Sequence, residues 1–160
     1  ANFDSIYVFP SRSSYAIFFT SETNGWLIRS DSLYHTTNAG SNWTPVHALN
    51  NIDVVGSIDF LDANTGICSD GRNVYKTTNA GVNWTTVFSS LGFGYIDVDM
   101  VSSTEFYFSV SGKIYRTVNA CTSFTQVLSS GQNGIIEIHF IDANNGWACG
   151  NNGALYKYKP

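Results

Sequence analysis

The sequence predicts an all-β fold, a β-propeller of four blades with four antiparallel strands in each. Three observations predict it: a segment of about 40 residues recurs along the chain, apolar and polar residues alternate within short runs, and Asn and Gly clusters bound those runs. Four strands in about 40 residues is the size of one propeller blade. We expect the 160 residues to form a single domain.

The composition suits many short strands joined by polar turns. Hydrophobic residues make up 43% and aromatic residues 15% of the chain, whereas charged residues make up 12%. That charged share is about half the usual one for a soluble domain. Ser, Thr, Asn and Gly solvate this chain instead, which favours strands and turns over helices, because helices draw on Glu, Lys, Ala and Leu.

The repeat is clearest in three segments that align without gaps, residues 33–43, 74–84 and 114–124. Each carries a Tyr and a basic residue, then a polar turn, then Trp or Phe. A fourth copy opens at residues 155–158. The equivalent tyrosines are 41, 40 and 41 residues apart: Tyr34, Tyr75, Tyr115 and Tyr156. We expect the first two features to lie on a third strand and the Trp or Phe to begin a fourth.

A second shared segment precedes each of these copies. It begins with Phe and ends with Gly and an apolar residue in residues 19–26, 60–67 and 140–147, and its third copy, residues 100–107, lacks the Gly. This segment predicts the first strand, a turn and the second strand of each blade. The predicted blades span about 10–50, 51–91, 92–131, and 132–160 together with 1–9.

Residues 36–43 and 77–84 resemble the Asp-box, or BNR repeat, and the pattern is most similar to Ycf48-like photosystem assembly factors. The resemblance covers nearly the whole chain. It differs in carrying Asn where the box has Asp, and Cys121 replaces the turn Gly in the third copy. Asn can close the same turn through its side-chain oxygen. The structural residues that the resemblance implies are Thr37, Asn38, Gly40, Trp43, Thr78, Asn79, Gly81, Trp84, Asn119 and Phe124.

The two chain ends are complementary in the phase of the repeat. Residues 1–3 align with residues 41–43, so the chain begins at a fourth strand and stops after a third. We therefore expect residues 2–9 to complete the last blade and close a four-bladed ring, which would leave no exposed edge strand. The alternative is a part of a larger ring, because Asp-box families usually carry six or more blades.

No catalytic constellation is recognisable, so we expect no enzyme. A sialidase-like site would need three converging arginines, and the chain has four in all: Arg12, Arg29, Arg72 and Arg116. Arg116 occupies the repeated basic position, which indicates a structural role. A fragment of a glycosidase-type propeller stays an alternative, since any two carboxyl groups about 5 to 10 Å apart would qualify.

Polar residues share one side of the predicted innermost strands. Asp97 and Glu137 align at one position, and Asp59, Asp99 and His139 align two residues further on. If these carboxylates face a narrow channel, a bound cation such as calcium would relieve the electrostatic repulsion between them. The other interpretation, which we favour, is that they hydrogen-bond water and neighbouring strands. No other cofactor is indicated.

Three aromatic residues follow the predicted turn between the first and second strands of their repeats and are candidates for ligand binding. Trp26 and Trp147 come directly after the Gly of an Asn-containing loop, where a ring can stack on a sugar, and Tyr107 occupies the equivalent position in the copy that lacks the Gly. The alternative, which we favour, is that they fill the core.

Charge and hydropathy limit the partners. The net charge is −4 with eight scattered basic residues, which argues against nucleic acid. No apolar run approaches the roughly 20 residues of a membrane helix, so we expect no membrane insertion. The chain starts at Ala1, as after signal-peptide removal, and we expect a secreted or cell-surface protein. Its three cysteines are expected to be unpaired and buried.

We therefore expect a non-enzymatic extracellular binding or adhesion module with a glycan or protein partner. The resemblance implies a partner-binding role of the assembly-factor kind, although no residue can be carried over for chlorophyll or photosystem binding. The alternative is a structural subunit that self-associates in a larger surface or filamentous assembly. Fold alone does not choose between them.

Overall fold

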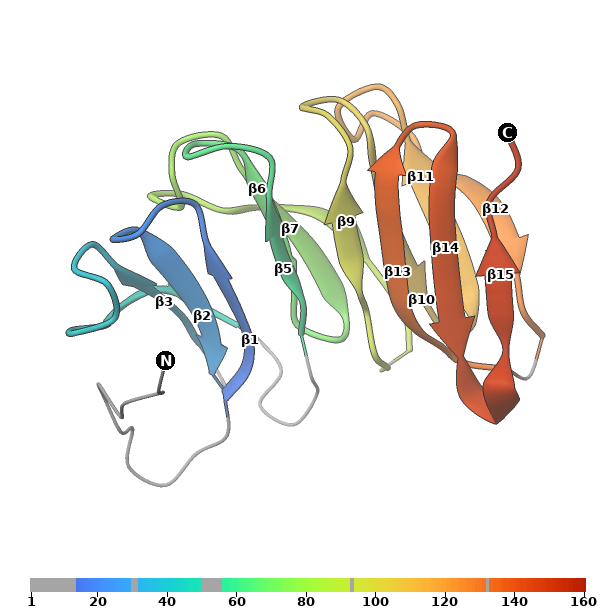
Figure 1. Ribbon diagram of the computed structural model, residues 1–160, viewed down its shortest axis with the longest axis horizontal. Helices are drawn as coiled ribbons and strands as arrows, with labels where there is room; N and C mark the ends of the chain where they lie inside the picture. Colours follow the sequence, from blue (N-terminus) through green and yellow to red (C-terminus); the bar gives the residue numbers. More distant parts are fainter. Residues whose placement is uncertain (1–13, 30–31, 50–55, 93, 132) are drawn as a thin grey trace.

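The computed structural model describes residues 14–29, 32–49, 56–92, 94–131 and 133–160. Within these ranges the chain forms β-strands and one short 3-10 turn. The strands build separate antiparallel sheets, each from consecutive segments of the chain (Figure 1). The predicted all-β fold of repeated antiparallel sheets is confirmed.

The first sheet contains β1 (Ser14–Phe19), β2 (Gly25–Arg29), β3 (Ser32–Thr36) and β4 (Thr44–Ala48). The second contains β5 (Ile58–Phe60), β6 (Gly66–Ser69), β7 (Asn73–Thr77) and β8 (Thr85–Ser89). The third contains β9 (Val98–Met100), β10 (Phe106–Val110), β11 (Lys113–Thr117) and β12 (Thr125–Ser129). The fourth contains β13 (Ile135–Asp142), β14 (Asn145–Gly150) and β15 (Leu155–Lys157), with the 3-10 turn Asn151–Gly153 before β15.

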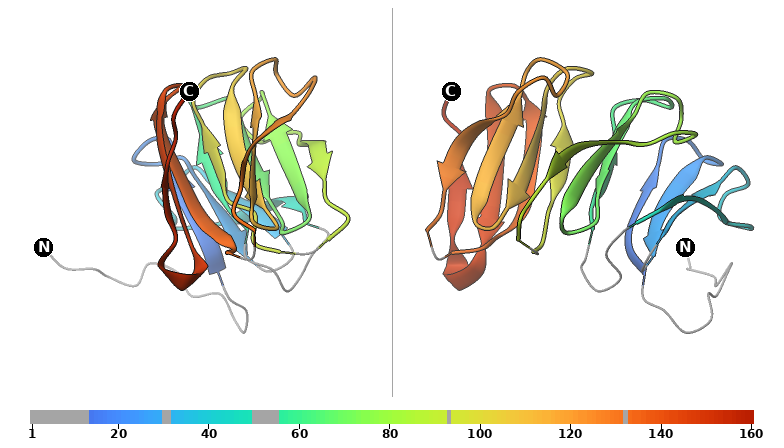
Figure 2. Two further views of the ribbon diagram at one scale, coloured as in Figure 1. Left: turned by 90° about the vertical axis from the view of Figure 1, so that its right-hand side faces the viewer. Right: turned by 180° about the vertical axis from the view of Figure 1, so that it is seen from behind.

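The four sheets stand side by side in a row, in chain order. Their innermost strands contact one another in sequence, β1 with β5, β5 with β9 and β9 with β13. The first and fourth sheets lie at opposite ends of the row, both in Figure 1 and in the view from behind (Figure 2, right). The described residues thus form an open row of sheets and no closed ring. The predicted closure by residues 2–9 lies outside the described residues.

A repeated polar turn joins the third and fourth strands of a sheet. In the second sheet the Thr77 hydroxyl accepts a hydrogen bond from the Gly81 N–H at 3.0 Å and donates to Asn79 Oδ1 at 3.0 Å. Asn79 Oδ1 also accepts from the Asn83 N–H at 2.9 Å. The same bonds recur around Thr36 and Asn38 in the first sheet. Asn therefore closes this turn, as predicted.

The third copy of this turn carries a strained residue. Cys121 has a φ of 76°, the left-handed value that Gly40 (81°) and Gly81 (75°) adopt at the same position.

The buried threonine of each turn is one residue earlier than predicted. Thr36 and Thr77 are 1% exposed, whereas the predicted Thr37 and Thr78 lie on the surface.

The core lies between neighbouring sheets, and we call each such contact a joint. The first joint contains Trp26, Ile28, Leu33, Phe60, Cys68 and Tyr75. The second contains Ile67, Val74, Val98, Met100, Phe106 and Phe108. The third contains Tyr107, Ile114, Ile138, Phe140 and Ala148. In the third joint the Tyr107 and Phe140 rings stack with centroids 3.5 Å apart. We call the face that a sheet turns toward the next sheet in the chain its forward face, and the face that it turns toward the preceding sheet its backward face. Each joint pairs the forward face of one sheet with the backward face of the next.

Candidate functional site

The inner-strand carboxylates, Asp59, Asp97 and Asp99, link neighbouring sheets. Asp59 Oδ2 accepts a hydrogen bond from the Met100 N–H at 2.7 Å, and Asp99 Oδ2 accepts from the Phe140 N–H at 2.8 Å. Asp97 Oδ2 accepts from the N–H of Ile138, also 41 residues further along the chain, at 2.7 Å. These bonds join the innermost strand of one sheet to the main chain of the next, as the favoured interpretation of the channel carboxylates predicts.

Burial raises the pKa of all three inner-strand carboxylates. The largest rise is at Asp99, where desolvation raises the pKa to about 6 against the hydrogen bond from Phe140, and the charges of Asp59 and Asp97 contribute to the rise. His139 Nδ1 lies 3.4 Å from Asp99 Oδ2, but the imidazole is 71% exposed. The main-chain hydrogen bonds offset part of the cost of removing these carboxylates from water.

A groove of about 280 Å³ runs along the inner strands beside these groups. It is lined by Phe18, Ile58, Asp59, Asp97, Val98, Asp99, Glu137, Ile138 and His139. Among the described residues, no group of three or more His, Cys, Asp or Glu side chains is arranged to hold a metal ion. The calcium hypothesis therefore gains no support from the geometry of this groove.

The three aromatic candidates occupy equivalent strand positions but differ in exposure. Trp26 is 1% exposed and stacks on Phe60 with centroids 4.0 Å apart. Tyr107 is fully buried on Phe140. Trp147 is 37% exposed. Trp26 and Tyr107 thus fill joints, and Trp147 alone of the three presents its ring at the surface.

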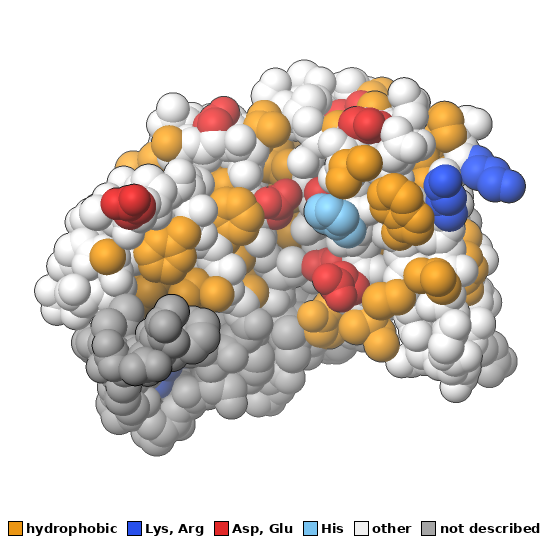
Figure 3. Space-filling model, viewed as in Figure 1, with side chains coloured by type: hydrophobic (Ala, Val, Ile, Leu, Met, Phe, Trp, Pro, Cys, Tyr) orange, Lys and Arg blue, Asp and Glu red, His pale blue; other side chains and the backbone are white. Residues whose placement is uncertain are grey.

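Trp147 belongs to what we call the fourth-sheet end face, the forward face of the last described sheet. This face consists of Glu137, His139, Trp147, Cys149, Leu155 and Lys157. Hydrophobic side chains gather there beside acidic and histidine side chains, with basic groups at the edge (Figure 3). Leu155 is 75% exposed, and Lys157 Nζ lies 5.8 Å from the centroid of the Trp147 ring. An exposed apolar face with a polar border is typical of a protein contact surface.

A cavity of about 250 Å³ adjoins this face at the outer side of the third joint. Val127, Leu128, Phe140, Tyr156 and Tyr158 are among its lining residues. In the first two joints the corresponding place is taken by Trp84 and Phe124, which precede the outermost strands β8 and β12. The cavity of the third joint thus lies at the place that an aromatic side chain fills in the first two joints.

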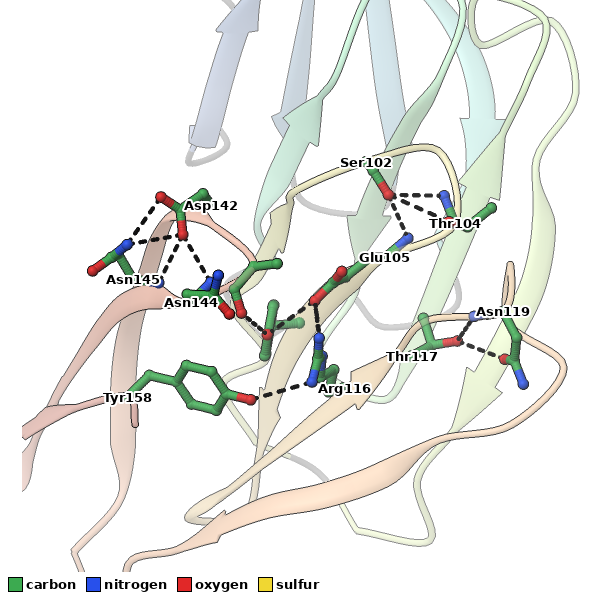
Figure 4. Close-up of polar contacts among 12 residues, drawn as sticks. Ser102, Thr104, Glu105, Arg116, Thr117, Asn119, Asp142, Asn144, Asn145 and Tyr158 are labelled. Atoms are coloured by element: carbon green, nitrogen blue, oxygen red, sulfur yellow. Dashed lines mark hydrogen bonds and ion pairs between the residues drawn. The ribbon is translucent and has the colours of Figure 1, made fainter. Parts of the chain in front are cut away.

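Arg116 takes part in a polar network at the third joint (Figure 4). Its guanidinium contacts Glu105 Oε1 through Nη2 at 2.6 Å and Nε at 2.8 Å, and Nη1 donates to the Tyr158 hydroxyl at 3.2 Å. Arg116 therefore has the structural role that the sequence predicts. Arg29 ends β2, and Arg72 lies in the turn between β6 and β7.

The three cysteines are unpaired in the structure, and only Cys68 is buried, whereas the favoured interpretation of the sequence has all three buried. Cys121 and Cys149 are half-buried. No helix within the described ranges has the length and hydropathy to cross a membrane.

The row of antiparallel sheets, three with four strands and the last with three among the described residues, packs face to face around inner strands and defines a β-propeller-type protein. No protein-family model and no curated protein matches the sequence. Solved structures do. Ycf48 bound to a D1 peptide matches with a TM-score of 0.73 at 16% identity, over 93% of this chain and 52% of that one. A GH74 enzyme from Niastella koreensis matches with a TM-score of 0.73 at 16% identity, over 90% of this chain and 28% of that one.

The computationally designed Ika4 protein matches with a TM-score of 0.74 at 12% identity, over 97% of this chain and 95% of that one. All three identities are low, so these similarities define the fold alone. The chain spans about half the length of Ycf48 and a smaller part of the GH74 enzyme.

Proposed function

We propose that this protein is a non-enzymatic binding module whose partner is a protein, and that the fourth-sheet end face is its contact surface. The exposure of Trp147 and Leu155 carries the proposal. The equivalent residues in the third sheet, Tyr107 and Ile114, are 0% and 4% exposed because the next sheet covers them. The equivalent residues are buried in the other sheets of this chain, so the exposed face is suited to burial against a partner. Covering it would stabilise the complex by about 25 cal/mol per Å² of apolar area buried.

The inner-strand carboxylates support a binding role over catalysis. A glycosidase needs one carboxyl group that protonates the leaving oxygen and a second that contacts the sugar or a water. Asp59, Asp97 and Asp99 each accept a main-chain hydrogen bond instead, which holds the sheets together. Similar structures include a peptide-bound protein and a glycoside hydrolase, so the fold is compatible with both classes.

Selection of peptide ligands tests this proposal. A random-sequence peptide library displayed on phage would be panned against the full chain, immobilised at low density. We expect enriched peptides whose affinity falls at least about tenfold with Trp147→Asp, because a central aromatic residue dominates such contacts. Val82→Asp is the matched control, since Val82 is 72% exposed in the turn between β7 and β8. Peptides bound equally by both variants would contradict the assignment of this face.

A glycan is the second candidate partner. The Trp147 ring with Lys157 beside it offers the stacking surface and the donor that sugar binding uses. A glycan array, together with hydrolysis assays on β-glucan substrates, distinguishes a lectin and an enzyme from a protein binder. We propose the same secreted or cell-surface setting for each of these binding roles.

A further inference from the structure

We propose that the partner of the fourth-sheet end face is a second copy of this chain, joined through the backward face of the first sheet, so that two copies close one propeller ring. This inference rests on the proposed function and names the partner of the same surface. It follows from four positions that every internal joint buries and that only the two ends of the row expose.

Two of these positions lie on the backward face of a sheet. Phe19 and Ile17 of β1 are 39% and 60% exposed. Their equivalents in the later sheets are all 7% exposed or less: Phe60, Met100 and Phe140 for Phe19, and Ile58, Val98 and Ile138 for Ile17. The first sheet therefore presents the uncovered half of a joint.

The other two positions lie on the forward face. Trp147 and Leu155 of the fourth sheet are exposed, and their equivalents in the other sheets are all 4% exposed or less: Trp26, Ile67 and Tyr107 for Trp147, and Leu33, Val74 and Ile114 for Leu155. The two ends of the row thus carry complementary halves of one repeated interface.

Phe19 is already held in the geometry that a joint requires. Its ring packs edge-to-face on Trp43 at a centroid distance of 6.1 Å and an angle of 82°. Phe60 packs on Trp84 in the same way, at 5.9 Å and 90°, and in addition stacks on Trp26 of the preceding sheet. Among the described residues no second ring stacks on Phe19, and Trp147 of the second copy would supply one.

The polar groups at the two ends are complementary as well. Glu137 and His139 occupy the positions at which Asp97 and Asp99 accept main-chain hydrogen bonds from the following strand. In the proposed joint they accept from the N–H groups of Ile17 and Phe19. Lys157 corresponds to Lys76, whose Nζ donates to the Ser103 carbonyl at 2.7 Å.

The position equivalent to Ser103 in the first sheet is Glu22, which is exposed. Lys157 of one copy therefore meets an acidic side chain of the other. Opposite charges at the border of an interface favour the correct pairing of two faces.

The open row leaves both of its end sheets free to contact a second copy. A four-bladed ring turns by about 90° from sheet to sheet, which brings the first and last sheets into contact. Here they lie at opposite ends of the row (Figure 1). Two copies supply eight sheets, within the range of known propellers, and a head-to-tail contact that closes on itself gives a finite ring.

Sedimentation equilibrium of the full 160-residue chain tests this inference. We expect twice the 17.6 kDa mass of one chain for the wild type and for Val82→Asp. Trp147→Asp, Leu155→Asp and Phe19→Asp should each give monomers with unchanged circular dichroism, because each breaks both joints of the ring. Mixing Trp147→Asp with Phe19→Asp should restore a dimer, because one joint then has two intact faces.

Each other outcome overturns the inference. A dimer that Trp147→Asp dissociates and Phe19→Asp leaves intact would mean that two fourth-sheet end faces meet each other. A wild-type monomer at all micromolar concentrations would exclude the second copy as partner. If the wild type is a monomer that still selects peptides through Trp147, only this inference fails. If the wild type is a monomer and selects no peptides through Trp147, the proposed function fails as well.

Discussion

Replacing Asp99 by Asn should stabilise the protein near neutral pH. The Asp99 carboxyl is 12% exposed, and its pKa rises in the fold from 3.8 to about 6. A rise of this size means that folding disfavours the charged form of Asp99, relative to the protonated form, by at most about 3 kcal/mol. Asn removes the charge and keeps an oxygen that can accept the hydrogen bond from the Phe140 N–H. We therefore expect a gain of up to about 3 kcal/mol in the free energy of unfolding at about pH 7.5.

The gain should depend on pH with a definite sign. Because the folded-state pKa of Asp99 lies above the unfolded value, its contribution to stability is fully present below pH 3.8 and is lost as the pH rises through about 6. The difference between Asp99→Asn and the wild type should thus shrink on acidification across this window. Asp99→Ala should be less stable than Asp99→Asn by about 1 to 3 kcal/mol, because the Phe140 N–H is left without its acceptor.

Urea unfolding followed by tryptophan fluorescence, at one fixed protein concentration, measures all three variants. Asp62→Asn is the control with the opposite sign. The hydrogen bonds from the Asn64 and Thr65 N–H groups lower the pKa of this exposed carboxyl, so its replacement should cost a little stability. A loss of stability with Asp99→Asn as large as that with Asp99→Ala would refute the reasoning, since the charged carboxylate would then be a net stabiliser.

Three further predictions concern the turns, the joints and the cysteines. Asn79→Ala should cost about 1 to 2 kcal/mol in thermal unfolding because its side-chain oxygen closes the turn, while Asn79→Asp should be neutral. Phe140→Ala should cost about 3 to 5 kcal/mol through the loss of packing on Tyr107, and an effect below 1 kcal/mol would contradict the stacked joint. In mass-spectrometric labelling with iodoacetamide, Cys68 should react only after unfolding, because burial raises the pKa of its thiol. Cys149, which lies on the fourth-sheet end face, should react in the folded Trp147→Asp variant and be protected in the wild type, where the second copy covers it.

The sheets could be predicted from the sequence because their signals are local. Alternation within a strand and Asn-Gly turns between strands depend on residues that are close in the chain, so the repeat defines each sheet by itself. The choice between Thr36 and Thr37 could not be made in this way. Both precede Asn38, and only the backbone direction at the end of β3 decides which hydroxyl points into the turn.

The candidate site depends on contacts between sheets, which local signals do not contain. Trp26 and Trp147 follow the same motif, yet one is core and one is surface because a neighbouring sheet covers only the first. The alignment of Asp59 and Asp99 predicts that they share a side of the inner strands. Their acceptance of main-chain hydrogen bonds from the next sheet depends on the register between sheets, and no residue pattern within one repeat encodes that register.

The carboxylate bridges between inner strands have an evolutionary consequence. Asp59, Asp97 and Asp99 accept hydrogen bonds from main-chain N–H groups, which are present whatever side chains the donating strand carries. A duplicated repeat therefore brings the donor half of the bridge with any sequence, and only the strand that accepts the hydrogen bond must keep its acid. Recombination can therefore add, remove or exchange repeats while the bridges between the remaining neighbours stay intact.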